Sequence, residues 1–475
     1  MGETIGEALR GDIVVGFNDI GDGVDRKELA RALDDEKASF LARTQKSKQL
    51  HHLGTDVLLG GVPMSWMNKW VGGYPIYFDS AIGSSIVDVD GNSYIDFCLG
   101  DTGAMAGHSP PAVARAVLER VSGAGGITTM LPNSDAARVG KNLKSRFLMD
   151  YWQFTLSATD ANRFALRLAR QITSRPKILV FSYCYHGSVD ETFVTLENGV
   201  ARSRAGNVGP ALDPTSTTEV VEFNDIDAVR AVLARGEIAA VLTEPALTNI
   251  GIVLPLPGFL SQLKQVAQQH GSLLILDETH TFSAGYGGAG SLYGVTGDMM
   301  TIGKSLGGGV PFGAYGMTKE VAERVGEQSE ADYVDTGGIG GTLAGNALSL
   351  GAARATLEEI FTRENFAWMI ELAGHFSAGV TQALERFALP WSVVSLGARV
   401  EYRFCGTPPI NGGESARAAD EDLDTYFHLF MLNRGILMTP FHNMALMSPS
   451  TTLGQVQFHT EVFQQACRTI AAAPR

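Results

Sequence analysis

The sequence predicts an α/β protein in which a large, mostly parallel sheet with helices on both faces is joined to a smaller α+β domain. Short runs of β-branched residues and leucine alternate with amphipathic helical patterns between about residues 109 and 359. After about Phe361 this alternation gives way to shorter, mixed elements. A chain of 475 residues is also long enough to form two domains.

The segments before this alternation predict an arm and a hairpin. Residues 25–53 are charged, with leucine and alanine at helical spacing, which indicates a helix on the surface. Residues 75–78 and 86–97 alternate between apolar and polar side chains. The break at Asp90-Gly91 is typical of a hairpin turn.

The middle of the chain supplies the strands of the predicted sheet. Amphipathic helices at residues 160–173 and 257–271 lie between some of them. The predicted strands are Gln153–Leu156, Ile178–Phe181, Val220–Phe223, Ala239–Thr243, Leu273–Leu276, Met299–Ile302 and Phe312–Gly316.

The end of the chain predicts the smaller domain, with strands at residues 399–404 and 436–438. We expect residues 1–105 to form an N-terminal arm and part of the small domain. The large domain would span residues 106–360. A C-terminal small domain would follow at residues 361–475.

The composition restricts the class of protein. Hydrophobic residues make up 45% of the chain and charged residues 19%, which is typical of an ordered globular protein. The formal charge of −14 disfavours nucleic acid and anionic membranes as partners. No apolar run approaches the ~20 residues that a membrane helix needs. The first residues lack a signal-peptide pattern, so we expect a cytoplasmic protein whose four scattered cysteines are free thiols.

The strongest functional signal is a pair of strand ends that carry a carboxylate and a lysine. One apolar run ends at Asp277 and Glu278, and the next ends at Lys304. Because such runs predict neighbouring parallel strands, both side chains would lie at the carboxyl edge of the sheet. A lysine there can form a Schiff base with pyridoxal phosphate (PLP), while the carboxylate keeps the pyridine nitrogen protonated. The pair therefore predicts PLP-dependent catalysis by Lys304 and Asp277, without a metal.

Each half of this signal also has a simpler interpretation. An Asp-Glu pair can begin a solvated loop, and the Gly-Lys-Ser tripeptide at 303–305 can be a loop or a phosphate-binding loop of nucleotide enzymes. The position of the first glycine of such a loop is occupied by Asp298. The glycines at 307–309, followed two residues later by Pro311, also prevent an immediate helix. Nucleotide binding is therefore excluded.

Other polar segments follow strands at the same predicted edge, where α/β proteins bind ligands. Ser157 and Thr159 flank the start of a helix whose first amides could bind phosphate, although N-capping alone also explains them. Tyr185 follows another strand, and its ring could lie on a pyridine ring or in the core. The remaining polar groups at this edge are His186, Glu244, Asn249 and the glycine-rich segment 341–346.

Together these segments resemble the class III aminotransferases of PLP fold type I, and in particular the branch that contains glutamate-1-semialdehyde 2,1-aminomutase. The resemblance is dense between about residues 60 and 359 and looser elsewhere. It rests on Ser-Ala-Thr-Asp-Ala-Asn at 157–162, Tyr-His-Gly at 185–187, Asp-Glu-Thr at 277–279, Gly-Lys at 303–304 and Gly-Thr-Leu-Ala-Gly-Asn at 341–346.

The resemblance implies a role for each residue that matches. Lys304 would hold the cofactor covalently and move the proton between the substrate and the cofactor. Asp277 would pair with the pyridine nitrogen. Thr279 and Tyr185 would lie on opposite faces of the ring, and Asn249 would bond to the 3′ oxygen.

The resemblance also implies a phosphate site that two subunits share. Ala158 and Thr159 would bind the phosphate, and Thr342 would reach it from a second subunit, so we expect a homodimer. Ala158 replaces the usual glycine, and a left-handed backbone there would cost roughly 1 kcal/mol. The remaining expected cofactor contacts are Ser157, His186 and Glu244.

The expected substrate positions depart from the pattern of that branch. Gly60-Gly61-Val62 leads to Pro63-Met64 where the aminomutase has an arginine that binds the substrate carboxylate. We therefore expect a transaminase that moves an amino group between a hydrophobic or bulky amine or amino acid and a keto acid. The candidate substrate residues are Trp66, Met67, Arg399, Arg403, Phe441 and His442.

Two alternatives stay open at this point. The same scaffold could carry an aminomutase or racemase, and a requirement for a keto co-substrate separates these from a transaminase. A non-catalytic α/β binding protein is disfavoured because it has no need to bury Lys304 and Asp277. Arg399 and Arg403 would lie on one face of a strand, where they could replace the lost cation or pair with local acids.

Overall fold

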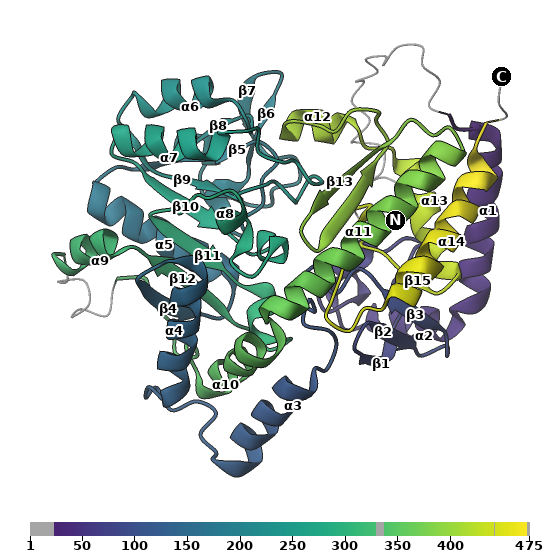
Figure 1. The fold of residues 1–475 in the computed structure, drawn as a ribbon, viewed down its shortest axis with the longest axis horizontal. Helices are drawn as coiled ribbons and strands as arrows, with labels where there is room; N and C mark the ends of the chain where they lie inside the picture. The colour runs from purple at the N-terminus through teal and green to yellow at the C-terminus, as the bar shows by residue number, and fades with distance from the viewer. Residues whose placement is uncertain (1–22, 329–336, 441, 473–475) are drawn as a thin grey trace.

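The computed structural model describes residues 23–328, 337–440 and 442–472. A large sheet formed by the middle of the chain lies at the left of Figure 1, and elements from both ends of the chain pack together at the right. Two hydrophobic cores match this division, because one is centred on the large sheet and the other joins the terminal elements to the sheet's edge.

The large sheet has seven strands in the order β4-β12-β11-β10-β9-β5-β8. Strands β8, β5, β9, β10 and β11 run parallel, and β12 is antiparallel to both of its neighbours. The mostly parallel sheet is therefore confirmed, and each predicted strand lies within two residues of an observed one. Their bounds are β4 Tyr151–Thr155, β5 Lys177–Phe181, β8 Thr218–Val221, β9 Ile238–Thr243, β10 Leu273–Asp277, β11 Met299–Ile302 and β12 Gly313–Met317.

Helices cover both faces of this sheet, as the sequence predicts. α5 (Ala158–Thr173) packs over β9, β11 and β12 with its apolar face buried. α6 (Ile226–Leu233) lies beside α7 (Phe259–Gln269), which begins directly after the left-handed Gly258. The start of α5 matters most for the site, because it follows β4 at the carboxyl edge of the parallel strands.

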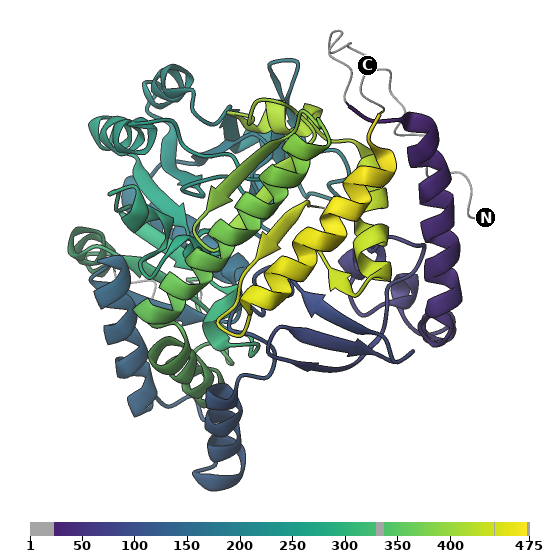
Figure 2. The same cartoon turned by 45° about the vertical axis from the view of Figure 1, so that its right-hand side comes forward.

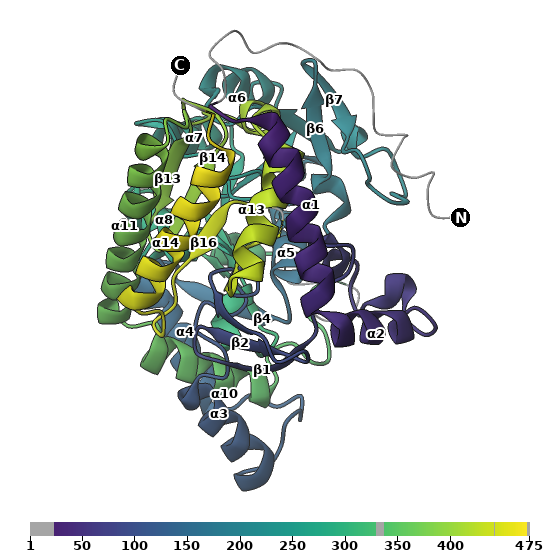
Figure 3. The ribbon, with the colours of Figure 1, turned by 90° about the vertical axis from the view of Figure 1, so that its right-hand side faces the viewer.

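The N-terminal arm forms two helices where the sequence predicts one. α1 (Arg26–Arg43) and α2 (Gln45–Gly54) meet at Thr44, whose Oγ1 donates to the Phe40 carbonyl at 2.7 Å and lies 3.0 Å from the Tyr74 hydroxyl. The contact with Tyr74 joins residues 30 positions apart, and it holds Thr44 outside the helical conformation. α1 packs along α13 (Glu421–Asn433) and α14 (Leu453–Ile470), as Figure 3 shows, so it is part of the terminal core.

Two small sheets are formed by the terminal parts of the chain, and one of them joins the two ends. The predicted hairpin forms from β2 (Ser85–Asp88) and β3 (Ser93–Asp96), and β3 pairs with β15 (Ile436–Leu437). This sheet also includes β1 (Phe78–Ile82). The other sheet is covered by a long helix that lies beside α14 (Figure 2). That sheet and its helix are β13 Ser392–Leu396, β14 Arg399–Arg403, β16 Met444–Leu446 and α11 Arg363–Arg386.

The remaining elements connect these layers. Among the described residues, no helix combines the length and apolar character that a bilayer-spanning segment requires. Within the same residues, no cluster of His, Cys, Asp or Glu side chains has the arrangement of a metal site. The connecting elements are α3 Pro111–Leu118, α4 Ser134–Phe147, β6 Val194–Glu197, β7 Val200–Ser203, α8 Gly288–Leu292, α9 Lys319–Gly326, α10 Ala347–Ala355 and α12 Gly412–Arg417.

Candidate active site

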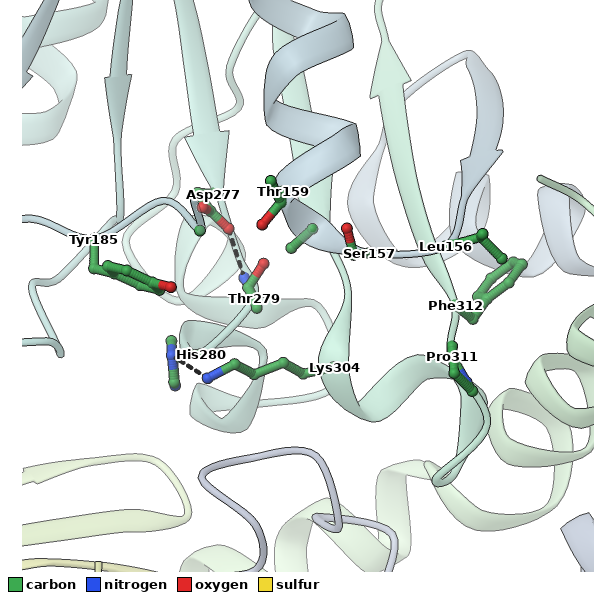
Figure 4. Close-up of a pocket in the computed structure, with 12 residues that line it drawn as sticks. Leu156, Ser157, Thr159, Tyr185, Asp277, Thr279, His280, Lys304, Pro311 and Phe312 are labelled. Carbon is green, nitrogen blue, oxygen red and sulfur yellow. Dashed lines mark hydrogen bonds between the residues drawn. The ribbon is translucent and has the colours of Figure 1, made fainter. Parts of the chain in front are cut away.

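Two neighbouring parallel strands bring the predicted carboxylate and lysine to one edge of the sheet. β10 ends at Asp277, which lies opposite Thr301 of β11, and Lys304 follows directly after β11. A cavity of about 250 Å³ opens between these strand ends and the start of α5 (Figure 4). Its walls are Leu156, Ser157, Ala158, Thr159, Tyr185, Gly187, Asp277, Thr279, His280, Lys304, Pro311 and Phe312.

Asp277 is buried at one end of the cavity, and both of its carboxylate oxygens accept hydrogen bonds. Oδ2 accepts from His186 Nδ1 at 2.9 Å and from Asn162 Nδ2 at 2.8 Å, and Oδ1 accepts from the Thr279 N–H at 3.0 Å. Burial alone would raise the pKa of Asp277, but these donors, with His186 foremost, hold the pKa below its ordinary value. Asp277 is therefore ionised, which is the state that a protonated pyridine nitrogen needs beside it.

His186 and Asn162 fix the direction of this carboxylate. Burial opposes a charge on His186, but Cys184 and Asp277 outweigh it and raise the pKa of His186 to about 10. His186 is thus a cation paired with Asp277. Asn162 Nδ2 also donates to the His186 carbonyl at 3.1 Å, and its Oδ1 accepts from Thr301 Oγ1 at 2.6 Å. These bonds tie the carboxylate to the sheet and to α5.

The start of α5 forms a second wall of the cavity. Ser157 caps the helix, and Ala158 is its first residue in the right-handed conformation, so the strain expected at Ala158 does not arise. Two glycines let the neighbouring loops approach, because a Cβ on Gly303 would lie 2.8 Å from the Ala158 nitrogen and one on Gly187 would collide with Thr159 Oγ1. The positive end of this helix dipole suits a phosphate.

Lys304 enters the cavity from the side opposite Asp277 in Figure 4. Its Nζ lies 2.8 Å from Asp101 Oδ2, 3.0 Å from the Asp101 carbonyl and 2.8 Å from His280 Nε2. Burial would raise the pKa of Asp101, but the charges of Lys304 and Arg399 and the hydrogen bond from Lys304 hold the pKa well below its usual range. Asp101 is therefore ionised beside the amine.

The ring nitrogen of His280 that faces away from Lys304 makes a separate set of contacts. Its Nδ1 lies 2.8 Å from Thr102 Oγ1, which also accepts a hydrogen bond from Arg399. Arg399 is only 2% exposed, and its Nε donates to Ser283 Oγ at 2.8 Å. Burial and the charge of Lys304 lower the pKa of His280 well below its ordinary value. His280 is therefore a neutral imidazole.

Four residues expected to contact the cofactor lie outside the walls of this cavity. One is His186, whose contact is with Asp277. Glu244 is buried and accepts a hydrogen bond from Thr248, and burial raises the pKa of Glu244 to about 7. Asn249 Nδ2 donates to the Tyr183 carbonyl at 3.1 Å. Thr342 is exposed on the surface ahead of α10. Contact between Thr342 and the phosphate of a second subunit stays a prediction.

The predicted substrate residues near the N-terminus lie at the side of Tyr185. The ring of Trp66 lies 5.4 Å from the ring of Tyr185, measured between centroids. Met67 follows it and is 38% exposed. Because Tyr185 lines the cavity, Trp66 lies next to one of its walls, and its contact with substrate stays a prediction.

The predicted substrate residues near the C-terminus are placed differently from one another. Arg399 reaches His280 and so borders the lysine end of the cavity. Arg403 lies 3.6 Å from Glu401, which fits the alternative that it pairs with a local acid. His442 is buried, and burial lowers its pKa to about 4. Phe441 lies outside the described residues.

Asp101 and His280 are the site residues that sequence reasoning missed. His280 directly follows the Asp-Glu-Thr motif, so a titratable side chain at this position was a usable signal. Asp101 has no comparable mark, because its contact with Lys304 joins segments 203 residues apart. Asn162 ends the Ser-Ala-Thr-Asp-Ala-Asn motif, but only its bond to Asp277 reveals what it does.

The walls of the cavity fit a phosphorylated pyridine aldehyde. An ionised carboxylate, a lysine and a helix N-terminus lie around one cavity. The carboxylate can pair with the ring nitrogen, the lysine can bind the aldehyde, and the helix N-terminus can bind the phosphate. Thr279 Oγ1 is buried without a hydrogen-bond partner among the described residues. A polar ligand in the cavity would supply one.

Comparisons with known proteins agree with this geometry. The family model for class III aminotransferases matches residues 66–460. A glutamate-1-semialdehyde 2,1-aminomutase 2 of Brevibacillus brevis is 35% identical over 406 residues, which cover 83% of this chain and 92% of that protein.

Solved structures give the same result. A glutamate-1-semialdehyde-aminomutase from Pseudomonas aeruginosa PAO1 in complex with PMP is 42% identical, with a TM-score of 0.91 over 94% of this chain and 100% of that one. A β-phenylalanine aminotransferase from Variovorax paradoxus is 26% identical, with a TM-score of 0.81 over 92% and 97%. This chain therefore belongs to the class III aminotransferases, which are PLP-dependent enzymes of fold type I.

Proposed function

We propose that this enzyme is a PLP-dependent aminomutase, which moves an amino group between neighbouring carbons of one substrate. The observation that carries the proposal is the similarity to proteins named glutamate-1-semialdehyde aminomutases, at 42% identity over 94% of the chain for a solved structure. The similarity of the Brevibacillus brevis protein supports it independently of any structure. These relatives favour the aminomutase alternative over the transaminase that the substrate positions suggest.

The residues around the cavity have distinct tasks in this proposal. Lys304 holds the cofactor through Nζ and carries the proton that moves during catalysis. Asp277 keeps the pyridine nitrogen protonated, and Thr159 with the start of α5 holds the phosphate. Tyr185 and Thr279 line the cavity where the two faces of the ring would lie. When bound, PLP supplies an electron sink next to the substrate.

The surroundings of Lys304 favour a substrate that carries an ammonium group. Asp101 and His280 place an anionic and a neutral acceptor beside the reacting amine. A substrate without an N–H donor at this point would leave these part-buried acceptors unpaired, at a cost of about 1–3 kcal/mol for each one. The amino group of a compact amino-carbonyl compound can satisfy them.

A transaminase acting on an amine and a keto acid is the second candidate. The segment after Gly60-Gly61-Val62 contains Pro63 and no arginine, and Trp66 offers an aromatic surface beside Tyr185. The similarity to a β-phenylalanine aminotransferase, at 26% identity, also fits this activity.

We also propose that the active form is a homodimer. The described chain leaves apolar side chains exposed next to the segment that carries Thr342, including Met130 at 79% and Leu131 at 73%. Ile127 ties this stretch to α10 through a 3.0 Å bond from the Ala347 N–H. A second copy would cover these side chains, because soluble proteins rarely expose large apolar patches. Sedimentation should show a dimer, and a fully active monomer would contradict the proposal.

The aminomutase proposal is tested by incubating the PLP-loaded enzyme with glutamate-1-semialdehyde and no keto acid. We expect repeated turnover to the isomer that carries the amino group on C1 and the carbonyl on C2, with unchanged molecular mass. The Lys304→Ala variant is the matched control and should form no product. Turnover that stops after one equivalent and resumes only when a keto acid is added would show a transaminase instead.

A further inference from the structure

The amine of Lys304 is surrounded by as many acceptors as an ammonium group has protons. Asp101 supplies its carboxylate Oδ2 at 2.8 Å and its carbonyl at 3.0 Å, and His280 supplies Nε2 at 2.8 Å. An ammonium group carries three N–H donors and no acceptor. We name Asp101 and His280 the ammonium receptor.

His280 can act as an acceptor because its tautomer is determined by its surroundings. The Lys304 ammonium only donates, so Nε2 must accept and the ring proton must lie on Nδ1. That proton is directed at Thr102 Oγ1, 2.8 Å away, which also accepts from Arg399. The low pKa of His280 keeps the ring neutral, and hence an acceptor, at neutral pH.

Asp101 is held toward the cavity by a backbone that is costly to form. Leu99, Asp101 and Thr102 all have positive φ angles, of 46°, 49° and 83°. Such conformations persist when surrounding bonds enforce them, and they cluster at functional sites. Here Asp96 Oδ1 accepts from the N–H groups of Cys98 and Leu99, both at 2.8 Å. These bonds stabilise the segment in the conformation that brings the Asp101 carboxylate to Lys304.

Lys304 cannot occupy the receptor throughout a reaction cycle. While its nitrogen is joined to the cofactor, it is no longer an ammonium group, and the ionised Asp101 loses its cationic partner. An incoming amine substrate arrives as an ammonium ion at neutral pH, with the charge and the three donors that the receptor needs.

We propose that Asp101 and His280 receive the ammonium group of the substrate before the exchange of amines and hold the ammonium group of Lys304 after it. The exchange transfers two protons from the substrate nitrogen to Lys304 Nζ as the carbon–nitrogen bond passes from one nitrogen to the other. One ammonium ion is therefore present before and after, and the receptor binds each in turn. This inference rests on the proposed amine chemistry and adds the residues that select a primary amine.

Other titratable groups near Asp101 do not compete for this role. Arg399 donates to Thr102, and its charge lowers the pKa of Asp101 without a hydrogen bond between the two side chains among the described residues. His442, with its pKa lowered to about 4, is neutral. Burial and the charge of Asp101 both raise the pKa values of Tyr185 and Cys98. Neither of these two side chains donates to the Asp101 carboxylate in the described part of the chain. The ammonium ion at Nζ is the close cationic partner of Asp101.

The test uses the full-length Lys304→Ala variant, which leaves the receptor free, with ethylammonium as the probe. Binding is measured by calorimetry without cofactor or substrate. We expect ethylammonium to bind at least tenfold more tightly than tetramethylammonium, which has the same charge and no N–H donor. Equal affinity for the two ions would overturn the proposal.

Two double variants assign the effect to residues. Adding Asp101→Asn to Lys304→Ala should weaken ethylammonium binding at least tenfold, and asparagine tolerates the left-handed backbone. Adding His280→Phe tests the receptor without touching the strained segment and should weaken binding severalfold. Adding Asp150→Asn, which breaks the surface ion pair with Lys144, should change nothing. Unchanged binding in both receptor variants would refute the assignment.

Because this test needs neither PLP nor turnover, its outcome is separate from that of the aminomutase assay. A chain that binds ethylammonium but does not isomerise glutamate-1-semialdehyde would keep the receptor and lose only the proposed substrate. A chain that isomerises the substrate but binds both ions equally would keep the function and lose the receptor.

Discussion

The two ends of the cavity each contain a histidine beside a carboxylate, yet His186 is protonated and His280 is neutral. At the Asp277 end, the charge and hydrogen bonds of the neighbours raise the pKa of His186 to about 10. At the Lys304 end, burial and the ammonium group lower the pKa of His280 well below its ordinary value. Groups whose environments push their pKa values apart usually have different roles in catalysis.

The difference teaches how one cavity combines a fixed end with an exchangeable one. Asp277 is tied to His186, Asn162 and a backbone N–H, and all of these contacts can persist while a cofactor is bound. Asp101 and His280 contact an amine that must become part of a covalent bond. The Asp277 end is therefore built to hold one charge state, and the Lys304 end to change partners.

The largest effect is expected at the exchangeable end. Lys304→Ala should lower turnover by several orders of magnitude, because it removes both the covalent anchor and the proton carrier. Single-turnover kinetics with added PLP would measure this loss. Turnover within tenfold of the native enzyme would mean that another group does the chemistry.

The next largest effect is expected at the fixed end. Asp277→Asn should keep the fold but lower kcat by a hundredfold or more, since losing two units of pKa at the ring nitrogen corresponds to about 2.7 kcal/mol. Circular dichroism would check the fold, and steady-state kinetics the rate. Near-normal turnover would show that the ring does not need this carboxylate.

A smaller effect should distinguish the two ends by pH. The folded-state pKa of His186 lies above its unfolded value of about 6.5, so His186 contributes stability that is complete below about pH 6.5 and lost as the pH rises toward 10. The melting temperature of His186→Gln should therefore lie furthest below that of the native chain at pH 6.5, and the gap should close toward pH 10. A gap independent of pH would argue against a charged His186.

The smallest effect has the opposite sign. The pKa of His280 is lower in the folded chain than in the unfolded chain, so its burial costs stability as the pH falls below about 6.5. Between pH 6.5 and 5, the melting temperature of the native chain should fall more steeply than that of His280→Gln. Parallel curves would contradict a neutral His280.

The same contrast explains what the sequence could predict. Asp277 and Lys304 end buried apolar runs, so the pattern placed both on adjacent strands, and all seven strands of the sheet were predicted near their observed positions. The residues around Asp277 could largely be predicted from the sequence, because residues 157–162 and 185–187 form local motifs. Roles within those motifs, such as that of Asn162, needed the contact itself.

The residues around the Lys304 amine could not be predicted from the sequence, because their positions depend on long-range contacts and on backbone conformation. The position of Asp101 depends on positive φ angles at Leu99, Asp101 and Thr102, of which leucine and threonine rarely adopt this conformation. It also depends on the hydrogen bonds that the Asp96 carboxylate accepts from the backbone before Asp101. The break between α1 and α2 was missed for a related reason, since the contact between Thr44 and Tyr74, 30 residues away, overrides a continuous helical pattern. Periodicity does not report such contacts.

The most direct test of the two-ended cavity is to locate the covalent anchor. The PLP-loaded enzyme would be reduced with borohydride, digested, and mapped by mass spectrometry for the peptide that carries the reduced cofactor. We predict a single label on Lys304. The single variant Asp101→Asn, which keeps Lys304, should carry its label there too. A label on any other lysine, or none in a chain that has bound PLP, would contradict the assignment of the two ends of the cavity.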